Sequence, residues 1–323
     1  MVRVLGVLTS GGDAPGMNAA IRAIVRSGLQ RGLAVVGVQH GYSGLMSGDF
    51  INLDAPSVSN IIQRGGTILR TDRAKEFRTP QGRIKAVHAM AKFGIDALIT
   101  IGGNGTLHGA SLLSKEHNIP VIGVPSTIDN DLFGTDWTIG YDTAVNTAIY
   151  NIDKIRDTAE ALERTFYIEV MGRATGFIAL DVGLATGAEY ISIPEHVTDL
   201  DVLLKLFERQ RATKRSNIVI VAEGDGQAAG ALELAKRVKE VNGMDYRVTI
   251  LGHIQRGGSP TARDRILASK LGAFAVDRIL AGDSCIMTGE TAGHLSTTPL
   301  QDAFTMSKEI DHSLVELSAL LSA

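Results

Sequence analysis

The sequence has little cysteine and little aromatic character. Among its 323 residues there is one cysteine, Cys285, and the aromatic share is 5%. A single cysteine cannot close a disulfide within the chain and cannot by itself build a metal site, which is typical of a reducing compartment. We therefore expect a soluble, cytoplasmic protein and interpret Cys285 as a small buried residue without a chemical role.

Long apolar runs and blocks of one charge are also missing. The apolar stretch at the N-terminus stops at Gly11 and Gly12, too early for a signal peptide core or a membrane span. The net charge is -3, and basic residues are spread along the chain rather than clustered. We therefore expect neither nucleic acid nor a membrane as a partner.

What the sequence does have is alternation of short apolar runs with longer helical patterns. With 323 residues, of which 44% are hydrophobic, the chain can bury a large core, and its length favours two domains. Expected strands are 2–8, 34–38, 97–101, 121–124, 166–170, 190–193, 218–222 and 248–251. The predicted fold class is α/β, with two Rossmann-like three-layer α/β/α domains and largely parallel sheets. We place one domain at 1–139 plus about 252–305 and the other at 140–251 plus about 306–323.

Two loops that follow predicted strands are rich in glycine. Residues 9–18 and 99–106 each run from a strand through glycines into a helix, where backbone N–H groups and a helix N-terminus can bind phosphate. The first loop lacks the Lys-Ser/Thr pair of a P-loop and the spacing of the dinucleotide fingerprint. One such loop is more often only a tight turn, but two of them favour a nucleoside triphosphate.

Two further loops carry acids and cations. Asp129 and Asp131 follow an apolar strand, so one could take a proton from a hydroxyl while the other holds a metal or orients its partner. His253 and Arg256 precede a glycine turn, and the planar arginine fork suits phosphate. Considered alone, the acids would be turn caps and the His–Arg pair surface residues. The arginines near strand ends or glycine turns are Arg73, Arg78, Arg164, Arg173, Arg247 and Arg256.

As an ordered set, these segments resemble the bacterial ATP-dependent 6-phosphofructokinases. The matching segments are 10–18, 64–67, 127–131, 171–173 and 251–260. The resemblance implies a glycolytic transferase that moves the γ-phosphate of ATP to the 1-hydroxyl of fructose 6-phosphate, with Mg²⁺ as cofactor. It also implies that the first domain binds ATP, that the second binds fructose 6-phosphate, and that the chain forms a homotetramer.

The same resemblance implies the site residues. Asp129 matches the base, with Thr127 and Asp131 beside it, and the other catalytic positions are Arg173, Gly12 and Arg73. The ATP-binding positions are Gly12, Arg73, Ala74, Gly102, Gly103, Asn104, Gly105 and Thr106. The substrate positions are Thr127, Ile128, Asp129, Arg164, Met171, Gly172, Arg173, Glu223, Arg247, His253, Ile254, Gln255 and Arg256, of which Arg164 and Arg247 would serve a neighbouring subunit.

One departure concerns the metal. The family loop normally reads Gly-Gly-Asp-Gly and its Asp helps to hold magnesium, whereas this chain has Asn104. An amide oxygen brings no charge and is the weaker ligand, so we expect an activity that is low or needs more Mg²⁺. A low-activity or non-catalytic regulatory paralogue that binds sugar phosphate or nucleotide therefore stays open as an alternative.

Other kinases remain to be weighed. Pyrophosphate-dependent phosphofructokinases carry Asp and Lys where this chain has Gly105 and Ser126, so ATP is favoured as the donor over pyrophosphate. Lipid and NAD kinases share only the second glycine loop and lack segments 127–131 and 253–256.

An effector site for ADP or phosphoenolpyruvate is also implied. Its positions are Arg22, Arg26, Arg156, Gly187, Glu189 and Lys214. Arg22 and Arg26 lie one helical turn apart, which suits a phosphate. Many relatives carry Arg, Tyr, Asp and Lys where this chain has Ala55, Pro56, Asn60 and Ala212. A partly degraded effector pocket is therefore the alternative to allosteric control.

Overall fold

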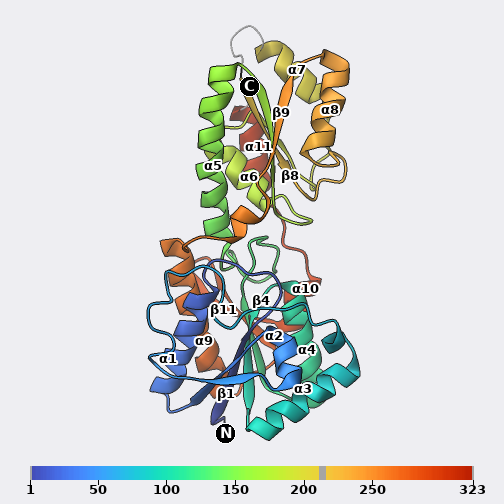
Figure 1. The fold of residues 1–323 in the computed structure, drawn as a ribbon. Coiled ribbons are helices and arrows are strands. Elements are labelled where there is room, and N and C mark those ends of the chain that lie inside the picture. Colours follow the sequence, from blue (N-terminus) through green and yellow to red (C-terminus); the bar gives the residue numbers. More distant parts are fainter. Residues whose placement is uncertain (1, 211–215, 322–323) are drawn as a thin grey trace. The chain divides into compact units, whose positions relative to one another are not determined.

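The computed structural model describes residues 2–210 and 216–321, which form two compact units. Unit 1 comprises residues 1–143 and 256–308, and unit 2 comprises residues 144–255 and 309–323. The ranges expected from the sequence were 1–139 with 252–305 and 140–251 with 306–323, a few residues from these bounds. Each unit is a sheet covered by helices, which confirms the predicted α/β class (Figure 1).

Unit 1 is built on a seven-stranded sheet in the order β11-β10-β5-β4-β1-β2-β3. Its strands are β1 Val4–Thr9, β2 Ala34–Val38, β3 Phe50–Leu53, β4 Ala97–Gly102, β5 Val121–Pro125, β10 Ile286–Thr291 and β11 His294–Pro299. The five inner strands run parallel, and the edge strands β3 and β11 are antiparallel to their neighbours. The sequence did not predict β3, β10 or β11, because these strands carry no continuous apolar run.

Helices cover both faces of this sheet because side chains along a strand alternate between its faces. Leu5 and Val7 of β1 pack with α1 and α9, whereas Leu8 packs with α2, α3 and α4 on the other face. The helices of unit 1 are α1 Met17–Gln30, α2 Gly41–Ser47, η1 Glu76–Arg78, α3 Pro80–Phe93, α4 Asn104–His117, α9 Ala262–Leu280 and α10 Leu300–Thr305. The short helix η2, Gly252–Arg256, lies where the chain passes from unit 2 into unit 1.

Unit 2 is built on a four-stranded parallel sheet in the order β7-β8-β6-β9. Its strands are β6 Thr165–Val170, β7 Tyr190–Ser192, β8 Asn217–Ala222 and β9 Tyr246–Ile250. Its helices are α5 Tyr141–Leu162, α6 Phe177–Thr186, α7 Leu200–Gln210, α8 Ala231–Asn242 and α11 His312–Leu321. Tyr167, Val219 and Val221 pack with α7 and α8, and Figure 1 shows α5, α6 and α11 on the other side of the sheet.

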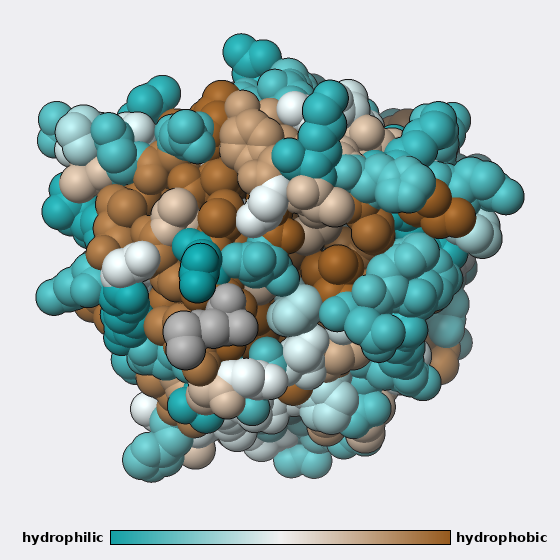
Figure 2. Space-filling view, turned by 90° about the horizontal axis from the view of Figure 1, so that it is seen from below, coloured by the Kyte–Doolittle hydropathy of each residue, from teal (hydrophilic) through white to brown (hydrophobic). Residues whose placement is uncertain are grey.

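The surface is not uniformly polar. Figure 2, seen from below relative to Figure 1, shows apolar side chains gathered over part of that face among polar ones. Folded chains ordinarily expose much apolar surface, so this area alone indicates no function. Within residues 2–210 and 216–321, no helix is both long and apolar enough to cross a bilayer.

Asp264 connects the N-termini of α9 and α5 within unit 1. Its Oδ1 accepts the N–H of Gly140 at 2.8 Å, and its Oδ2 accepts the N–H of Thr143 at 2.8 Å. In return, Thr261, the N-cap of α9, donates its hydroxyl to Asp142 in the first turn of α5 at 2.6 Å. Each helix N-terminus therefore has a carboxylate beside it, the charge that the helix dipole favours there.

This buried carboxyl should make unfolding dependent on pH. Burial raises the pKa of Asp264 from 3.8 to about 6, against the hydrogen bonds from Thr143 and Gly140, which lower it. Because the folded pKa lies above the unfolded one, the contribution of Asp264 to stability is complete below about pH 4 and is lost as the pH rises through about 6. A separation of about two pH units corresponds to about 3 kcal/mol of unfolding free energy.

Urea unfolding of the wild type and of Asp264→Asn, between pH 4 and pH 7, measures this contribution. The unfolding free energy of the wild type minus that of the variant should fall by roughly 3 kcal/mol as the pH rises, because asparagine does not titrate. A difference in unfolding free energy that stays constant with pH would contradict the assignment to Asp264.

Candidate functional site

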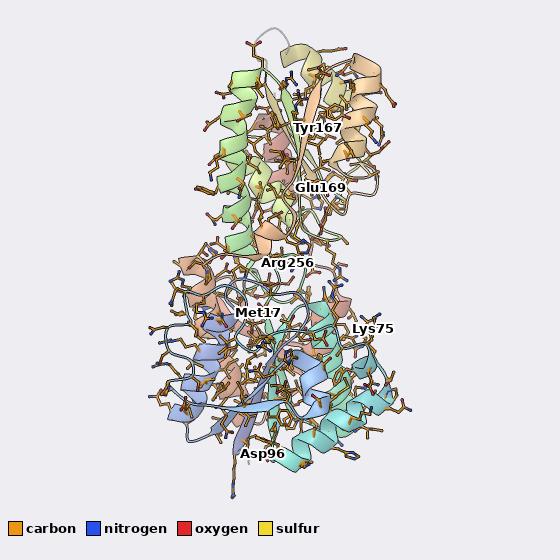
Figure 3. All side chains as sticks on the ribbon, viewed as in Figure 1. Met17, Lys75, Asp96, Tyr167, Glu169 and Arg256 are labelled. Atoms are coloured by element: carbon orange, nitrogen blue, oxygen red, sulfur yellow. The ribbon has the colours of Figure 1, made fainter. Side chains whose placement is uncertain are left out.

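The first glycine loop follows β1 and lies against Arg256, which is labelled in Figure 3. A Cβ on Gly12 would come within 2.7 Å of the Arg256 guanidinium. The same guanidinium donates to the backbone oxygen of Asp13 at 3.3 Å. Glycine at position 12 therefore leaves room for a cation at the loop that opens α1.

The second glycine loop, residues 102–106, is held against the first. The Thr106 hydroxyl donates to the backbone oxygen of Ser10 at 2.9 Å, and a Cβ on Gly102 would lie 2.6 Å from that oxygen. Gly103 is the N-cap of α4. Apart from the chain neighbours and the backbone of α4 itself, no atom lies within 4 Å of the position that a Cβ on Gly105 would take. An open loop at a helix N-terminus is suited to a chain of phosphates.

The acidic loop after β5 lies beside the second glycine loop. Thr127 and Asp129 are 8% and 6% exposed, and the Asp129 N–H donates to the Thr127 hydroxyl oxygen at 3.2 Å. Asn104 Nδ2 donates to Asp131 Oδ2 at 2.6 Å. Thr127, Asp129, Asp131 and Asn104 are thus together at the carboxyl ends of β4 and β5, where open α/β sheets bind their ligands.

Asn130 and Thr138 brace the acidic loop, and neither was predicted from the sequence to support the site. The backbone of Asn130 is in the left-handed conformation, with a φ of 52°, and its Oδ1 accepts the Thr138 N–H at 3.0 Å. The Thr138 hydroxyl donates to the backbone oxygen of Thr127 at 2.6 Å. Asparagine tolerates this backbone conformation, so its place between two aspartates was the one available signal.

Arg73 and Ala74 line an open cavity of about 480 Å³ in unit 1, together with Lys75 (Figure 3). The loop that carries them is tied to the first glycine loop, because the Thr71 hydroxyl donates to the backbone oxygen of Gly11 at 2.7 Å. The structure therefore brings the Arg73 segment and the glycine loop into one region of unit 1.

Two side chains in this region could donate oxygen atoms to a divalent metal, and phosphates would have to supply the rest. In the part of the chain that the structure describes, no group of three or more His, Cys, Asp or Glu side chains could enclose a metal. Asn104 and Asp131 offer amide and carboxylate oxygens, and Mg²⁺ is commonly held by one or two carboxylates together with substrate phosphates. The pair therefore fits a Mg²⁺ ion shared with a phosphate chain, with no charge contributed by Asn104.

In unit 2, the loops after β6 and β8 meet. Arg173 has a left-handed backbone, with a φ of 58°, and its N–H donates to Glu223 Oε1 at 2.8 Å. A Cβ on Gly224 would overlap the carbonyl oxygen of Arg173, so this approach requires glycine. The Met171 N–H donates to Oε1 of the fully buried Gln255 at 2.9 Å. The substrate positions grouped here are Met171, Gly172, Arg173, Glu223 and Gln255.

Arg164 and Arg247 lie at the opposite end of this sheet. Arg164 precedes β6, and Arg247 pairs in register with Phe166 near the start of β9. A six-residue strand is roughly 20 Å long, so these arginines do not meet Arg173 within one chain. Their action in a neighbouring subunit stays a prediction. His253 and Ile254 are exposed on η2.

Three of the effector positions meet in unit 2. Arg156 Nη2 donates to the backbone oxygens of Thr186 at 2.5 Å and Gly187 at 3.2 Å, and Nη1 lies 4.0 Å from Glu189 Oε1. Arg22 and Arg26 lie on α1 in unit 1. Lys214 is outside the described residues.

Comparison with known proteins identifies similar sequences. The profile of the family described as Phosphofructokinase matches residues 4–279. ATP-dependent 6-phosphofructokinase 1 of Thermus thermophilus is 54% identical over 319 residues, which cover 98% of this chain and 99% of that protein. ATP-dependent 6-phosphofructokinase of Clostridium botulinum is 52% identical over 322 residues, which cover 99% of this chain and 100% of that protein.

Solved structures have the same fold. Phosphofructokinase from Saccharomyces cerevisiae matches with a TM-score of 0.91 and 36% identity over 99% of this chain, which spans 48% of the yeast chain. Pyrophosphate-dependent phosphofructokinase from Marinobacter aquaeolei matches with a TM-score of 0.85 and 22% identity, over 97% of this chain and 86% of that one. At that lower identity, the likeness concerns the fold alone.

Proposed function

The chain belongs to the phosphofructokinase family, and on this premise we propose that it is a glycolytic kinase that transfers the γ-phosphate of ATP to the 1-hydroxyl of fructose 6-phosphate. The products are fructose 1,6-bisphosphate and ADP. The observation that carries the proposal is the buried Asp129 at the end of β5, beside Thr127 and the second glycine loop. The names of relatives that are 52% and 54% identical over nearly the whole chain support it.

Asp129 acts as the general base. Its carboxylate takes the proton of the 1-hydroxyl, the oxygen attacks the γ-phosphorus, and the bond from that phosphorus to the bridging oxygen of ADP breaks. The Asp129 N–H donates to the Thr127 hydroxyl, so the backbone that carries the base is held in place. Thr138 adds to this support through the backbone oxygen of Thr127.

The charge on the transferring phosphoryl is offset by fixed groups. Within unit 1, Arg73 supplies a cation and the loop of residues 102–106 supplies backbone N–H groups at the α4 N-terminus. Arg173 is proposed as a second cation for the same phosphoryl group. Groups held in place before the reaction stabilise the transition state without a cost of reorganisation.

Mg²⁺ would be held at this site by Asn104 and Asp131 together with the nucleotide phosphates. When bound, it offsets the negative charge of those phosphates. Asn104 supplies an uncharged oxygen, so we expect weak metal binding by the protein alone.

ATP is the donor rather than pyrophosphate. Gly105 and Ser126 stand where pyrophosphate-using relatives carry Asp and Lys, and the space beside Gly105 is open. An aspartate there would bring negative charge toward a longer phosphate chain, which opposes its binding.

The residues assigned to fructose 6-phosphate are those expected from the sequence. Glu223 accepts a sugar hydroxyl, and Arg247, His253 and Arg256 bind the 6-phosphate. Because Arg164 and Arg247 are remote from Arg173 within one chain, a homotetramer in which a neighbouring subunit supplies them is part of the proposal. A cytoplasmic location fits the glycolytic substrate and the single cysteine.

Regulation by ADP or phosphoenolpyruvate is proposed to be weak. Arg156 already donates to two backbone oxygens, of Thr186 and Gly187, and an effector phosphate would have to displace these contacts. The site would otherwise comprise Arg22, Arg26, Gly187, Glu189 and Lys214.

An assay of fructose 1,6-bisphosphate formation from fructose 6-phosphate and ATP, across a Mg²⁺ titration, tests the function. We expect turnover with ATP and none when pyrophosphate replaces it. Binding of both substrates without turnover at saturating Mg²⁺ would instead support the regulatory paralogue.

A further inference from the structure

The segment that leads to Arg73 contains a strained residue. Arg70 has a left-handed backbone, with a φ of 60°, which is disfavoured for residues with a Cβ and which glycine adopts freely. Two hydrogen bonds hold this backbone. The Arg70 backbone oxygen accepts the Thr9 hydroxyl at 2.8 Å, and the Arg70 N–H donates to the backbone oxygen of Thr67 at 3.2 Å. Glycine would adopt this backbone conformation without strain, so we look for the role of arginine in the contacts of its side chain.

The Arg70 side chain is held by His40. Arg70 Nη1 donates to His40 Nε2 at 3.2 Å, and since a guanidinium has no acceptor, that ring nitrogen must carry the lone pair. The proton of the neutral ring is therefore on Nδ1, which donates to Asp49 Oδ2 at 3.0 Å. Asp49 thus fixes both the orientation and the tautomer of the ring that accepts from Arg70.

The N-terminus of α2, where His40 lies, is itself fixed. The His40 N–H donates to the backbone oxygen of Leu69 at 2.8 Å, and a Cβ on Gly41 would lie 2.8 Å from the backbone oxygen of Thr9. The start of α2 is therefore pressed against the end of β1, the strand that leads into the first glycine loop.

A second contact links α2 to Arg73 through Asp72, the residue before it. The Ser43 hydroxyl donates to Asp72 Oδ2 at 2.5 Å, and Asp72 Oδ1 accepts the N–H of Arg73 at 2.6 Å. Between these two anchors, the Thr71 hydroxyl donates to Gly11 at 2.7 Å. Three successive residues are thus attached to α2 and to the glycine loop.

We propose that Arg70 and His40 are positioning residues for Arg73, an inference that rests on the proposed function. Their contact holds the strained backbone of Arg70 in place, and with it the residues that lead to Arg73. The Arg73 side chain therefore starts from a fixed position. A cation held in place stabilises a transferring phosphoryl better than one that must be reordered. Neither residue touches the reacting atoms.

Steady-state kinetics of His40→Ala and His40→Gln test the proposal. Loss of this solvent-exposed hydrogen bond should lower kcat roughly three- to tenfold, with little change in the KM for fructose 6-phosphate. Glutamine keeps an acceptor for Arg70 and should restore most of kcat. His88→Ala, at an exposed histidine of α3 in the same unit, is the matched control and should equal the wild type.

The decisive comparison is made in an Arg73→Ala background. If His40 acts through Arg73, then His40→Ala should have no further effect on kcat there. The same fold-loss in both backgrounds, or a lowered Tm with kcat unchanged, would overturn the proposal.

Hydrogen–deuterium exchange of a peptide spanning residues 70–74 separates this inference from the proposed function. Exchange should be faster in His40→Ala than in the wild type and should be restored in His40→Gln, whether or not the chain turns over ATP. An inactive wild type with this exchange pattern would overturn the proposed function alone. Equal exchange in all three chains would overturn the positioning role.

Discussion

Replacing Asp129 by serine is expected to lower kcat by about 10²- to 10⁴-fold, the range that a positioned general base contributes. Serine cannot accept the proton of the 1-hydroxyl near neutral pH, so the attacking oxygen must lose it to water. The KM for ATP should change little, because the glycine loops and the Arg73 segment, which are proposed to bind the nucleotide, are untouched. Measurement of ADP release at saturating substrates gives kcat directly.

The same replacement at Asp201, an exposed residue of α7, is a control for the loss of a carboxylate as such. It should leave kcat unchanged. A fall of less than tenfold for Asp129→Ser, with Tm unchanged, would show that another group takes the proton.

Replacing Asn104 by aspartate is expected to lower the Mg²⁺ concentration for half-maximal activity by about tenfold, because a charged oxygen ligand replaces a neutral one. The change also removes a donor. Asn104 Nδ2 now donates to Asp131 Oδ2 at 2.6 Å, and aspartate would place two carboxylates there. Without a cation these would repel each other, so the metal-free variant should have a lower Tm that Mg²⁺ restores.

Thermal unfolding and activity, each titrated with Mg²⁺, measure both effects. Asn118→Asp, the same substitution at the C-cap of α4, is the matched control and should change neither Mg²⁺ dependence. If Asn104→Asp leaves the Mg²⁺ dependence of activity and of Tm as in the wild type, position 104 is not at the metal.

Apart from β10, the parallel strands of the two units were predictable because most of each is a short apolar run. Residues 34–38, for example, were expected as a strand and form β2, Ala34–Val38. β11, His294–Pro299, was not predicted, since it is rich in Ser and Thr and lies at an edge of the sheet. An edge strand with one open side has little need for apolar residues, so it carries no such signal.

The candidate site was predictable where its residues follow neighbouring strands. Asp129 and the loop of residues 102–106 both lie at carboxyl ends, which meet at one edge of a parallel sheet. The supports of the site were not predictable. His40 and Arg70 are 30 positions apart, and neither belongs to a motif.

The sequence by itself determined the α/β class and membership of the phosphofructokinase family, and it supplied the candidate phosphate-binding groups. These depend on periodicity and motifs, which extend over only a few residues. The tertiary structure decided which polar groups meet, as with Asn104 and Asp131 across 27 positions or Thr143 and Asp264 across 121. Such contacts depend on the order in which strands join the sheet. That order is set by the packing of the whole core, so no local pattern records that Asn104 donates to Asp131.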